Sequence, residues 1–538
     1  MLRSMASRSQ SFVPTVAHQG EFVDSIDPAT GAIVERVPAT PISELPDIFH
    51  RAREAQRKWV TLTRAERARM LRKLRDAIYG ARDEIVALVS RESGKPRVES
   101  VFADLLIALD TADFLSRRAS RWLRPERVPH HNLAFKAKSG WLEYAPHGVI
   151  AIISPWNYPF AIPMSQVIAA VVAGNAVVLK PSELTPATGA LVGELFRRAG
   201  FPVGVVQVVH GAGNTGAALI ECGPDKVIFT GSVATGKHVA EACAQRLIPS
   251  ILELGGKDAM LVLADADLDV ASSAAVWGSF TNCGQACLSV ERIYVEKSVA
   301  ERFTNLCVEK TKELRVGPAS DADAEIGPMI RLRQRDKVED QLRDAVERGA
   351  KMLTGGGHRV DLGANFLQPA VVTGVDHSMK LMQEETFGPV LAVCAVDSAE
   401  QAIAMANDSH FALSASVWTR DMRRARRIAS QLRAGSVMIN DLVSYYGICE
   451  APHGGPRASG WGHTHSRLGL LEMVQVKYVD VDRLPRIHKA WWFGYSGKLI
   501  DSARGFVDAL FAPRWSGRLK AMLRRDGARG VVFRGHRV

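Results

Sequence analysis

The sequence feature that most constrains the fold is a run of short apolar strands alternating with helices between residues 149 and 232. The strands are rich in β-branched residues, and the helices carry apolar residues at three- and four-residue spacing. The pattern predicts strands over 149–153, 176–180, 205–211 and 226–232, and helices over 162–172 and 186–198. Strands that are apolar on both faces and separated by helices are typical of a parallel, doubly wound α/β sheet, which usually binds a nucleotide at the carboxyl ends of its strands.

Helices and a second α/β region flank this run. Apolar periodicity predicts helices from about Ser43 to Leu123, followed by a short strand over 140–147. A second α/β stretch extends from Leu261 to about Gly455, and the strands predicted in and after it are 292–296, 391–396 and 473–481. A chain of 538 residues exceeds one ordinary core, so we expect two or three domains.

The positive charge is concentrated in the C-terminal tail. Of the net charge of +11, residues 486–538 contribute +9, from twelve Lys or Arg and three Asp. The nearly neutral remainder gives no support for nucleic-acid binding. The tail holds Trp491, Trp492 and Trp515, and it predicts a helix with an apolar face formed by Leu499, Ile500, Ala503, Phe506, Val507, Leu510 and Phe511. A basic, Trp-rich amphipathic helix favours contact of residues 490–525 with an anionic membrane surface. Docking on a partner subunit and disorder are the alternatives.

The cysteines and the hydropathy pattern indicate the compartment. Seven scattered cysteines, an odd number, do not suggest a disulfide framework, so we expect a reducing, cytoplasmic location with the tail peripheral to a membrane. No run of about 20 apolar residues predicts a membrane-spanning helix. Residues 1–20 contain Arg and Ser, and we interpret them as a disordered tail rather than a targeting segment.

Two short motifs carry a thiol and a carboxylate. Cys287, in FTNCGQACLSVER, follows a Gly-Gln turn and is expected to open a helix, where a lowered pKa makes a thiolate accessible. Glu253, in LELGGK, stands between two leucines, and desolvation raises the pKa of such a carboxylate toward that of a general base. Taken alone, each residue has a structural alternative: a buried apolar thiol and a salt-bridged Glu.

Two further motifs follow strands of the predicted sheet. Asn157, in SPWNYP, offers an amide donor that can stabilise an oxyanion together with the backbone N–H of Cys287. Lys180 and Glu183, in KPSE, stand at the carboxyl end of a strand, where such side chains suit ribose hydroxyls. The alternatives are a turn-forming Asn between prolines and a helix start with Ser182 as N-cap.

Two glycine-containing turns complete the set. In FTGSVATGK, Gly231 and Gly236 bracket a strand-to-helix turn whose free N–H groups can receive a pyrophosphate. The Lys of this motif is followed by His rather than Ser or Thr, so it is not a P-loop. In EETFGPV, Glu385 and Phe387 precede a Gly-Pro turn into a strand, and a plain loop is the alternative.

These six motifs, in this order and at these separations, resemble the aldehyde dehydrogenase superfamily, from about residue 25 to residue 484. The resemblance implies a Rossmann-type doubly wound cofactor domain, an α/β catalytic domain and a small β oligomerisation element. The implied boundaries are 21–125 with 148–255 for the cofactor domain, 256–455 for the catalytic domain, 126–147 with 456–484 for the oligomerisation element, and 485–538 for the tail. A homodimer or homotetramer is expected, built through the strands near 140–147 and 473–481.

The resemblance also implies a role for each residue. Cys287 would be the nucleophile, Glu253 the base for the thiol and for the hydrolytic water, and Asn157 the oxyanion donor. The implied cofactor contacts are Trp156, Lys180, Ser182, Glu183, Gly231, Ser232, Gly236, Leu254, Glu385 and Phe387. No metal site is expected. Cys283 is interpreted as a neighbouring buried thiol, and three clustered histidines are interpreted as loop residues: His453, His463 and His465.

The implied reaction oxidises an aldehyde to a carboxylic acid through a thiohemiacetal and a thioester on Cys287. Glu183 should repel a 2′-phosphate, which favours NAD, with NADP as the alternative. The expected substrate pocket is apolar and favours aliphatic or aromatic aldehydes, with succinate semialdehyde as the alternative; its expected residues are Tyr158, Ile162, Leu288, Tyr445 and Tyr446. Acylating relatives, which pass the thioester to coenzyme A, typically lack the Glu, so Glu253 favours hydrolysis. A catalytically silent structural homologue is the non-enzyme alternative.

Overall fold

A computed structural model describes residues 21–132, 135–489 and 491–523. The disordered tail predicted for residues 1–20 lies outside the described residues. Contacts divide the chain into two compact units. The first comprises the chain up to Leu123 together with Pro146–Gln475, and the second comprises Arg124–Ala145 together with the chain from Val476. We describe each unit by itself, and the functional domain boundaries given above stay predictions.

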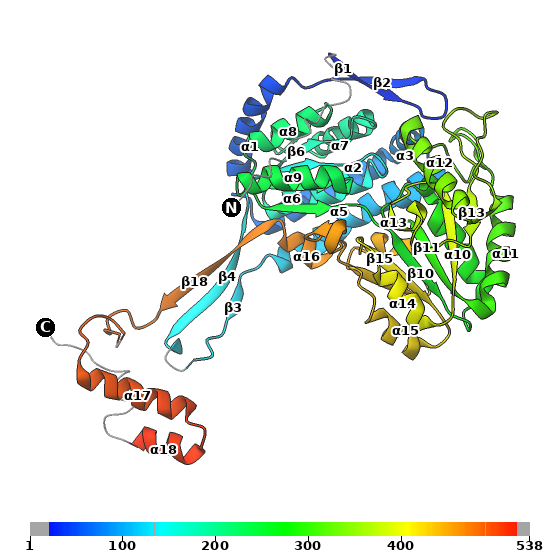
Figure 1. Ribbon diagram of the computed structural model, residues 1–538. Coiled ribbons are helices and arrows are strands. Elements are labelled where there is room, and N and C mark those ends of the chain that lie inside the picture. The colour runs from blue at the N-terminus through cyan, green and yellow to red at the C-terminus, as the bar shows by residue number, and fades with distance from the viewer. Residues whose placement is uncertain (1–20, 133–134, 490, 524–538) are drawn as a thin grey trace, which may run out of the picture. The chain divides into compact units, whose positions relative to one another are not determined.

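A six-stranded sheet lies at the centre of the first unit's N-terminal half (Figure 1). Its strands are β5 (Val149–Ile153), β6 (Ala176–Lys180), β7 (Val206–Val208), β8 (Lys226–Thr230), β9 (Ser250–Glu253) and β17 (Gly460–Trp461). Their order is β17-β9-β8-β5-β6-β7; β5 to β9 pair in parallel, and β17 pairs antiparallel with β9. The chain winds from β5 outward to β7 and then returns to β8, so a switch point lies between β5 and β8. This topology confirms the predicted doubly wound sheet.

The strands of this parallel sheet are apolar on both faces because both faces are covered. Val149, Ala151 and Ile153 pack in one buried cluster with residues of α1, whereas Ile150 and Ile152, which point to the opposite face, are fully inaccessible. The helices that follow these strands are α6 (Ala161–Ala173), α7 (Pro186–Arg198), α8 (Gly213–Glu221) and α9 (Val233–Gln245). The preceding helices are α1 (Leu45–Trp59), α2 (Arg64–Gly80), α3 (Arg82–Ser93), α4 (Arg97–Glu99) and α5 (Leu106–Trp122), with a π-helical turn over Ser100–Leu105.

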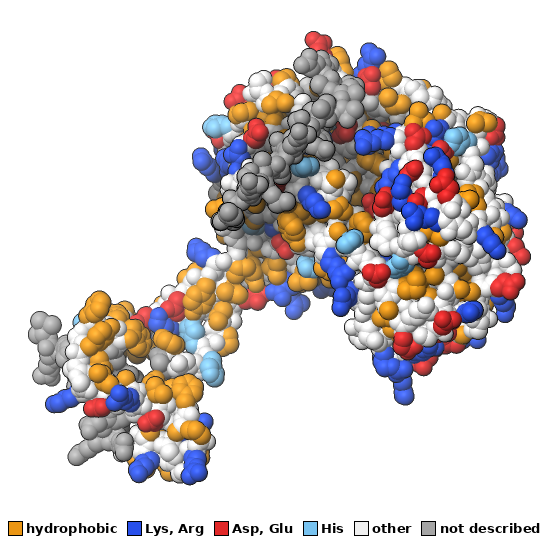
Figure 2. Space-filling view, in the orientation of Figure 1, with side chains coloured by type: hydrophobic (Ala, Val, Ile, Leu, Met, Phe, Trp, Pro, Cys, Tyr) orange, Lys and Arg blue, Asp and Glu red, His pale blue; other side chains and the backbone are white. Residues whose placement is uncertain are grey.

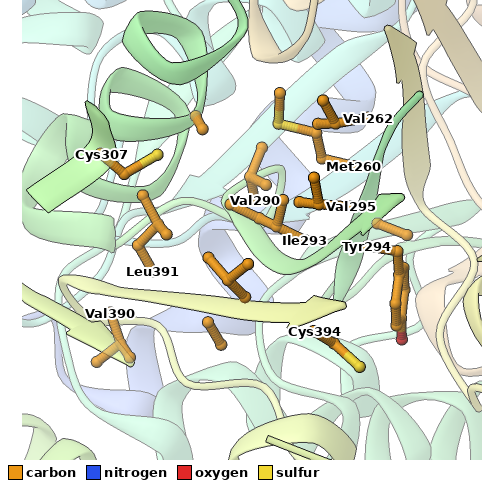
Figure 3. Close-up of a cluster of buried hydrophobic side chains, with 14 of the residues drawn as sticks. Met260, Val262, Val290, Ile293, Tyr294, Val295, Cys307, Val390, Leu391 and Cys394 are labelled. Carbon is orange, nitrogen blue, oxygen red and sulfur yellow. The ribbon is translucent and has the colours of Figure 1, made fainter. Parts of the chain in front are cut away.

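A seven-stranded sheet follows, in the order β12-β13-β14-β11-β10-β15-β16, with β12 antiparallel and the others parallel. Its strands are β10 (Asp258–Val262), β11 (Val290–Glu296), β12 (Lys351–Thr354), β13 (Ala370–Thr373), β14 (Val390–Val396), β15 (Ser414–Trp418) and β16 (Ser436–Ile439). Its helices are α10 (Leu268–Phe280), α11 (Lys297–Glu313), α12 (Leu332–Glu347), α13 (Lys380–Gln383), α14 (Ala399–Asn407) and α15 (Met422–Ala429); α16 (Ser466–Leu471) comes later. Figure 3 shows its core, in which Met260, Ile293 and Leu391 are fully buried.

Two smaller sheets complete the architecture. A hairpin of β1 (Phe22–Ile26) and β2 (Ile33–Pro38) belongs to the first unit. The second unit contains most of a three-stranded sheet of β3 (Glu126–Val128), β4 (Lys138–Pro146) and β18 (Val474–Asp482), followed by α17 (Gly497–Phe511) and α18 (Trp515–Leu523). The tail helix predicted from the apolar periodicity is therefore present over residues 497–511. Over the described parts of the chain, every helix is too short or too polar to span a bilayer.

Candidate active site

Cys287 lies in a turn between a 3-10 helix (Thr281–Gly284) and β11. The helix predicted to begin at Cys287 is wrong, because the Gly-Gln turn leads within a few residues into a strand of the seven-stranded sheet. Burial raises the pKa of the Cys287 thiol above its ordinary range, and the nearby carboxylates of Asp258, Glu385 and Glu253 add to the rise. A neutral thiol in this position needs a base before it can attack a carbonyl carbon.

The turn before the thiol is strained and held by a residue that the sequence did not single out. Asn282 and Cys283 adopt positive φ values of 52° and 56°. The carboxylate of Glu99 accepts bonds from the Asn282 N–H at 2.9 Å and 3.0 Å and from the Thr281 hydroxyl at 3.0 Å. These bonds offset the backbone strain and fix the start of the loop that carries Cys287. Cys283 itself is a buried thiol, as expected.

Glu253 ends β9 and lines the same cleft as Cys287 and Asn157. Its side chain is almost completely buried, and burial raises its pKa well above the ordinary value of a Glu, with the Thr464 hydroxyl acting in the opposite direction. Within hydrogen-bonding geometry, neither carboxylate oxygen has a partner among the described residues. A desolvated, unpaired carboxylate is a stronger base than an exposed one, which suits it to take a proton from a thiol or a water.

Asn157 follows β5 and points its amide at the loop that carries Cys287. Its Nδ2 donates to the Gln285 carbonyl at 3.1 Å, two residues before Cys287. The Asn157 carbonyl oxygen accepts from the Asn282 side chain at 2.9 Å and from Lys95 Nζ at 2.7 Å. An amide nitrogen carries two hydrogens, so one remains for an oxyanion formed beside the sulfur atom.

The cleft in front of the thiol is closed by two aromatic rings and a carboxylate. The rings of Trp156 and Phe387 meet edge to face, 5.5 Å apart. Glu385 accepts the Gly256 N–H at 3.0 Å, and burial raises its pKa to about 7. Phe387 has a φ of 54°, a conformation that Glu291 supports by accepting its N–H at 2.9 Å. The predicted segment around Glu385 is thus a braced part of the cleft rather than a plain loop.

The predicted phosphate-binding turn lies at the N-terminus of α9. Ser232 is the N-cap, and its hydroxyl accepts the Thr235 N–H at 3.3 Å. Gly236 allows the first turn to lie against Leu254, since a Cβ there would come within 2.4 Å of the leucine. Gly231, Ser232 and Leu254 all line the cleft that holds Cys287. The free N–H groups of this 13-residue helix suit a pyrophosphate.

A second cavity opens at the carboxyl ends of β6 and β7, and Glu183 lines it. Lys180 Nζ is buried 3.5 Å from the Glu183 carboxylate. Ser182 is not a helix N-cap, because α7 begins only at Pro186 and the Ser182 hydroxyl accepts the Leu184 N–H instead. The cavity also contains His210 and Thr215, which the sequence did not reveal because strand β7 ends earlier than predicted. The carboxylate of Glu183, with Lys180 beside it, suits the hydroxyl groups of an adenosine ribose.

An apolar cavity of about 290 Å³ reaches Cys287 from another side. Four of the five predicted substrate-pocket residues line it: Tyr158, Ile162, Leu288 and Tyr446. Tyr445 does not, because its ring packs behind the wall against Leu288 and Leu413. The wall also contains apolar residues that sequence reasoning missed, since they come from α5, the π-helical turn before it and α10: Phe102, Ala103, Leu106, Ile107 and Trp277.

Comparisons with known proteins identify the family. Residues 15–479 match the model of the aldehyde dehydrogenase family. A 4,4′-diapolycopene aldehyde oxidase from a Methylomonas species is 38% identical over 491 residues, which is 91% of each chain. A putative NADP⁺-dependent succinate-semialdehyde dehydrogenase from Mycolicibacterium smegmatis is 38% identical over 479 residues, 88% of this chain and 91% of that protein.

Solved structures give the same result. A Brucella melitensis aldehyde dehydrogenase superposes with a TM-score of 0.82 at 34% identity, covering 87% of this chain and 95% of that one. An NAD⁺ complex of a Bacillus cereus aldehyde dehydrogenase also gives a TM-score of 0.82, at 32% identity over 86% and 94% of the two chains. The fold has a Rossmann-type sheet and a second α/β sheet, with a thiol, a carboxylate and an amide at the cleft. This chain therefore belongs to the aldehyde dehydrogenase family.

Proposed function

We propose that the protein oxidises an apolar aldehyde to a carboxylic acid, with Cys287 as the nucleophile and NAD or NADP as the oxidant. One observation carries the proposal: Cys287 lines both the polar cleft that fits a dinucleotide and the apolar cavity that reaches it separately. A sulfur atom at the junction of two cavities can bond to a carbon from one side while that carbon faces a hydride acceptor on the other.

The residues around the cleft would hold the cofactor in three places. Lys180 and Glu183 suit the adenosine ribose, the N-terminus of α9 suits the pyrophosphate, and Glu385 with Phe387 suits the nicotinamide ribose and ring. When bound, the nicotinamide supplies a hydride acceptor. A carboxylate at Glu183 favours NAD over a 2′-phosphorylated cofactor, although a relative is named for NADP⁺.

The chain's own residues account for the proton and charge movements. Glu253 removes the thiol proton of Cys287, and the sulfur adds to the aldehyde carbon. Asn157 Nδ2 and the Cys287 N–H donate to the oxygen that becomes negative. After the hydride has left, the carbonyl re-forms as a thioester on the sulfur. Glu253 gives its first proton to solvent and then takes a proton from water, whose oxygen attacks the thioester carbon. The C–S bond breaks, the proton passes from Glu253 to the sulfur of Cys287, and the acid is released.

The apolar cavity supports the substrate class. Among the residues that line it there is no Lys or Arg to pair with a substrate carboxylate. An aliphatic or aromatic aldehyde would bury its carbon atoms there, at roughly 0.8 kcal/mol for each CH₂ group. The relative named for an aldehyde of 4,4′-diapolycopene is in keeping with this class. Succinate semialdehyde is the second candidate, because several relatives carry that name.

A substrate panel tests both candidates. Hexanal, dodecanal, benzaldehyde, retinal and succinate semialdehyde are compared with NAD and with NADP, and absorbance of the reduced cofactor is followed. We expect kcat/KM to rise with chain length and to be lowest for succinate semialdehyde. Cys287→Ala should abolish reduction of the cofactor, with Cys283→Ala as the matched control that retains it. Cofactor reduction by Cys287→Ala at the normal rate would refute the mechanism.

We also propose that α17 and α18 contact an anionic membrane surface. The two helices pack together through small residues, since Ala509 and Ala521 are buried, whereas large apolar side chains are exposed. Ile500, Val507 and Phe511 share one face of α17, and Trp515 and Leu523 are 75% and 76% exposed on α18. Figure 2 shows hydrophobic and basic side chains together on this unit. Exposed aromatic residues beside Lys and Arg suit a lipid headgroup layer that carries negative charge.

Vesicle co-sedimentation tests this surface. The full-length protein should sediment with vesicles that contain phosphatidylglycerol and much less with phosphatidylcholine alone, and salt should weaken the binding. Phe511→Ser with Trp515→Ser should reduce binding several-fold, whereas Val203→Ser, at a residue 95% exposed in the first unit, should not. Equal binding of all three proteins would exclude α17 and α18 as the membrane-binding surface. A dimer that forms with rising protein concentration and is lost only in the tail variant would indicate that α17 and α18 contact a partner subunit instead.

A homodimer or homotetramer is proposed through β4 and β18, as the family resemblance implies. β18 forms an edge of the three-stranded sheet and exposes Val476, Tyr478 and Val481. An exposed apolar edge strand invites pairing with another chain. Sedimentation equilibrium of the wild type and of Val476→Lys would measure the assembly, and an unchanged mass would argue against this edge.

A further inference from the structure

Three segments that lead into neighbouring strands of the seven-stranded sheet meet at one edge of it. Lys257 stands directly before β10, Glu291 is the second residue of β11, and the EETFG loop (384–388) precedes β14. These strands are adjacent and parallel, in the order β14-β11-β10, so their amino ends lie at the same edge. The two charged side chains that meet there have no part in the mechanism proposed above.

Lys257 and Glu291 form a buried ion pair that bonds to the EETFG loop. Lys257 Nζ lies 2.5 Å from Glu291 Oε2, and the two side chains are 0% and 2% exposed. The ammonium group also donates to the Thr386 hydroxyl at 2.9 Å. Glu291 Oε2 accepts the Thr386 N–H at 2.7 Å, and Oε1 accepts the Phe387 N–H at 2.9 Å. One carboxylate thus holds two successive backbone N–H groups of the loop.

The carbonyl groups of the same loop are held from α12. Gln334 donates to the Thr386 and Phe387 carbonyl oxygens, both at 3.1 Å, and Gln341 donates to the Glu385 carbonyl oxygen at 3.4 Å. Phe387 has a φ of 54°, which is unfavourable for an aromatic residue. Such a conformation persists only where the surroundings fix it, and an ionised carboxylate is a stronger acceptor than a neutral group.

The EETFG loop brings two side chains to the cleft that contains Cys287. Glu385 and Phe387 both line this cleft, and the Phe387 ring meets the Trp156 ring edge to face at 5.5 Å. The Gly256 N–H donates to the Glu385 carboxylate at 3.0 Å. Transfer between two bound groups requires the reacting atoms to approach within roughly 3–3.5 Å, so a small displacement of this loop would slow a transfer in the cleft.

We propose that Lys257 and Glu291 are positioning residues for the hydride acceptor. Their ion pair holds the EETFG loop so that Glu385 and Phe387 keep the nicotinamide beside the carbon that is bonded to the sulfur atom. Neither Lys257 nor Glu291 exchanges a proton or an electron pair. The inference rests on the proposed function, because the pair acts only through the side chains proposed to contact the cofactor.

The steps that need no cofactor should not depend on this pair. The loop that carries Cys287 is held by other residues, since Glu99 accepts the Asn282 N–H and Asn157 donates to the Gln285 carbonyl oxygen. Attack of the sulfur on an ester and hydrolysis of the resulting thioester use this loop alone. Loss of the ion pair should therefore separate the transfer of hydride from the chemistry of the thiol.

The pair also contributes to the charge around Glu385. Burial raises the pKa of Glu385, the negative charge of Glu291 adds to the rise, and Lys337 of α12 and Lys257 act in the opposite direction. The remaining titratable group in the cleft that faces Glu385 is the Cys287 thiol. Without the charge of Glu291, the pKa of Glu385 should be lower, because less repulsion opposes its ionisation.

Three measurements on the full-length protein separate these steps. Stopped-flow absorbance of the reduced cofactor in the first turnover, with hexanal and with [1-²H]hexanal, reports the steps up to hydride transfer. Hydrolysis of p-nitrophenyl acetate without cofactor reports acylation and deacylation of Cys287. Calorimetric titration with NAD at several pH values gives the Kd without turnover.

Two variants remove the pair and one serves as the control. Glu291→Gln removes the carboxylate, and Glu291→Gln with Lys257→Met leaves no unpaired buried charge, so this double variant decides if the single one does not fold. Asp265→Asn is the matched control. The Asp265 carboxylate also accepts two successive backbone N–H groups, those of Arg420 and Asp421. It follows β10 and therefore lies at the opposite edge of the same sheet.

We expect Glu291→Gln to reduce the cofactor roughly tenfold to hundredfold more slowly in the first turnover, as a misplacement of about 1 Å would predict. The isotope effect on this turnover should be at least as large as in the wild type, because the slowed step breaks the C–H bond. Hydrolysis of p-nitrophenyl acetate should stay close to the wild-type rate. The Kd for NAD should be higher, and its increase at acidic pH should begin at a lower pH. Asp265→Asn should match the wild type throughout.

The same measurements can overturn the proposal. An equal loss of cofactor reduction and of ester hydrolysis in Glu291→Gln would indicate a general structural role. An isotope effect below that of the wild type, or a normal first turnover in a variant that thermal melting shows to be folded, would also refute it. If the wild type reduces no NAD with any aldehyde, the proposed function fails, whereas the calorimetric titration still tests the link between Glu291 and Glu385.

Discussion

Replacing Lys95 with Met should both destabilise the protein and slow acylation, because this lysine joins the core to Asn157, the proposed oxyanion donor. Lys95 and Asp104 form an ion pair of 2.7 Å, and both side chains are fully inaccessible. Lys95 Nζ also donates to the Asn157 carbonyl at 2.7 Å. Asp104 in turn accepts the N–H groups of Phe160 and Ala161 at the start of α6. The pair therefore fixes the loop between β5 and α6.

The expected loss of stability in Lys95→Met follows from the burial of the Lys95–Asp104 ion pair. Removing one partner leaves an uncompensated buried charge, which costs about 3–5 kcal/mol. Lys95→Met with Asp104→Asn should recover much of this loss, because the amide oxygen can still accept both N–H groups and no charge is left. An exposed pair provides the control: Arg198 and Glu84 are 2.8 Å apart but 40% and 49% exposed, so Arg198→Met should cost less than about 1 kcal/mol.

Urea titration followed by tryptophan fluorescence measures the free energy of unfolding, and nitrophenol release from p-nitrophenyl acetate measures acylation. We expect acylation by Lys95→Met to fall about tenfold or more, which is less than the roughly hundred- to thousandfold loss found when an oxyanion donor is removed outright. The double variant should regain stability but not the acylation rate, since neither side chain can then hold the Asn157 carbonyl. A Lys95→Met protein no less stable than Arg198→Met would refute the reasoning.

Three further outcomes are expected. Burial raises the pKa of Glu385 to about 7, so its side chain becomes protonated and neutral as the pH falls below 7. The KM for the cofactor should therefore rise below pH 7 in the wild type. In Glu385→Gln this KM should be independent of pH. Gly284→Ala should lower the melting temperature by several degrees, because φ is +71° and a Cβ would lie 2.1 Å from the Gly388 carbonyl oxygen, whereas Gly447→Ala, in open space, should not. Trp277→Arg should reduce kcat/KM for dodecanal at least tenfold and raise kcat/KM for succinate semialdehyde. An unchanged ratio of the two values would exclude the apolar cavity as the substrate pocket.

The sequence predicted the elements whose signal is local. β5 and β6 and helix α7 begin and end as predicted, because a doubly buried strand is a continuous apolar run and α7 begins at a proline. The ordered motifs also placed Cys287, Glu253 and Asn157 in one family, and the structure brings them to one cleft. Their catalytic roles stay proposals until the variants above are measured.

The sequence did not reveal contacts made by segments that are distant along the chain. A helix after Cys287 was expected from a local turn, but tertiary pairing with β10 makes the following residues a strand. His453 stands in a Gly-rich segment that reads as an exposed loop, whereas in the structure it is buried and pairs with Thr464. Glu99, half-buried on α4, and Lys95, buried in the loop before α4, are charged side chains, and no periodicity marks them as supports of the Cys287 loop and of Asn157.

The two-residue strand β17 has a consequence for how the protein is made. Until residues near 460 have left the ribosome, β9 is an open sheet edge, and Glu253 has no covering segment. Domains fold as synthesis proceeds from the N-terminus. The six-stranded sheet would therefore keep its β9 edge exposed while the whole second α/β region is translated. A nascent chain at this stage would be a natural client for a chaperone, and premature termination before residue 460 would yield an aggregation-prone protein in which β9 stays unpaired at Glu253.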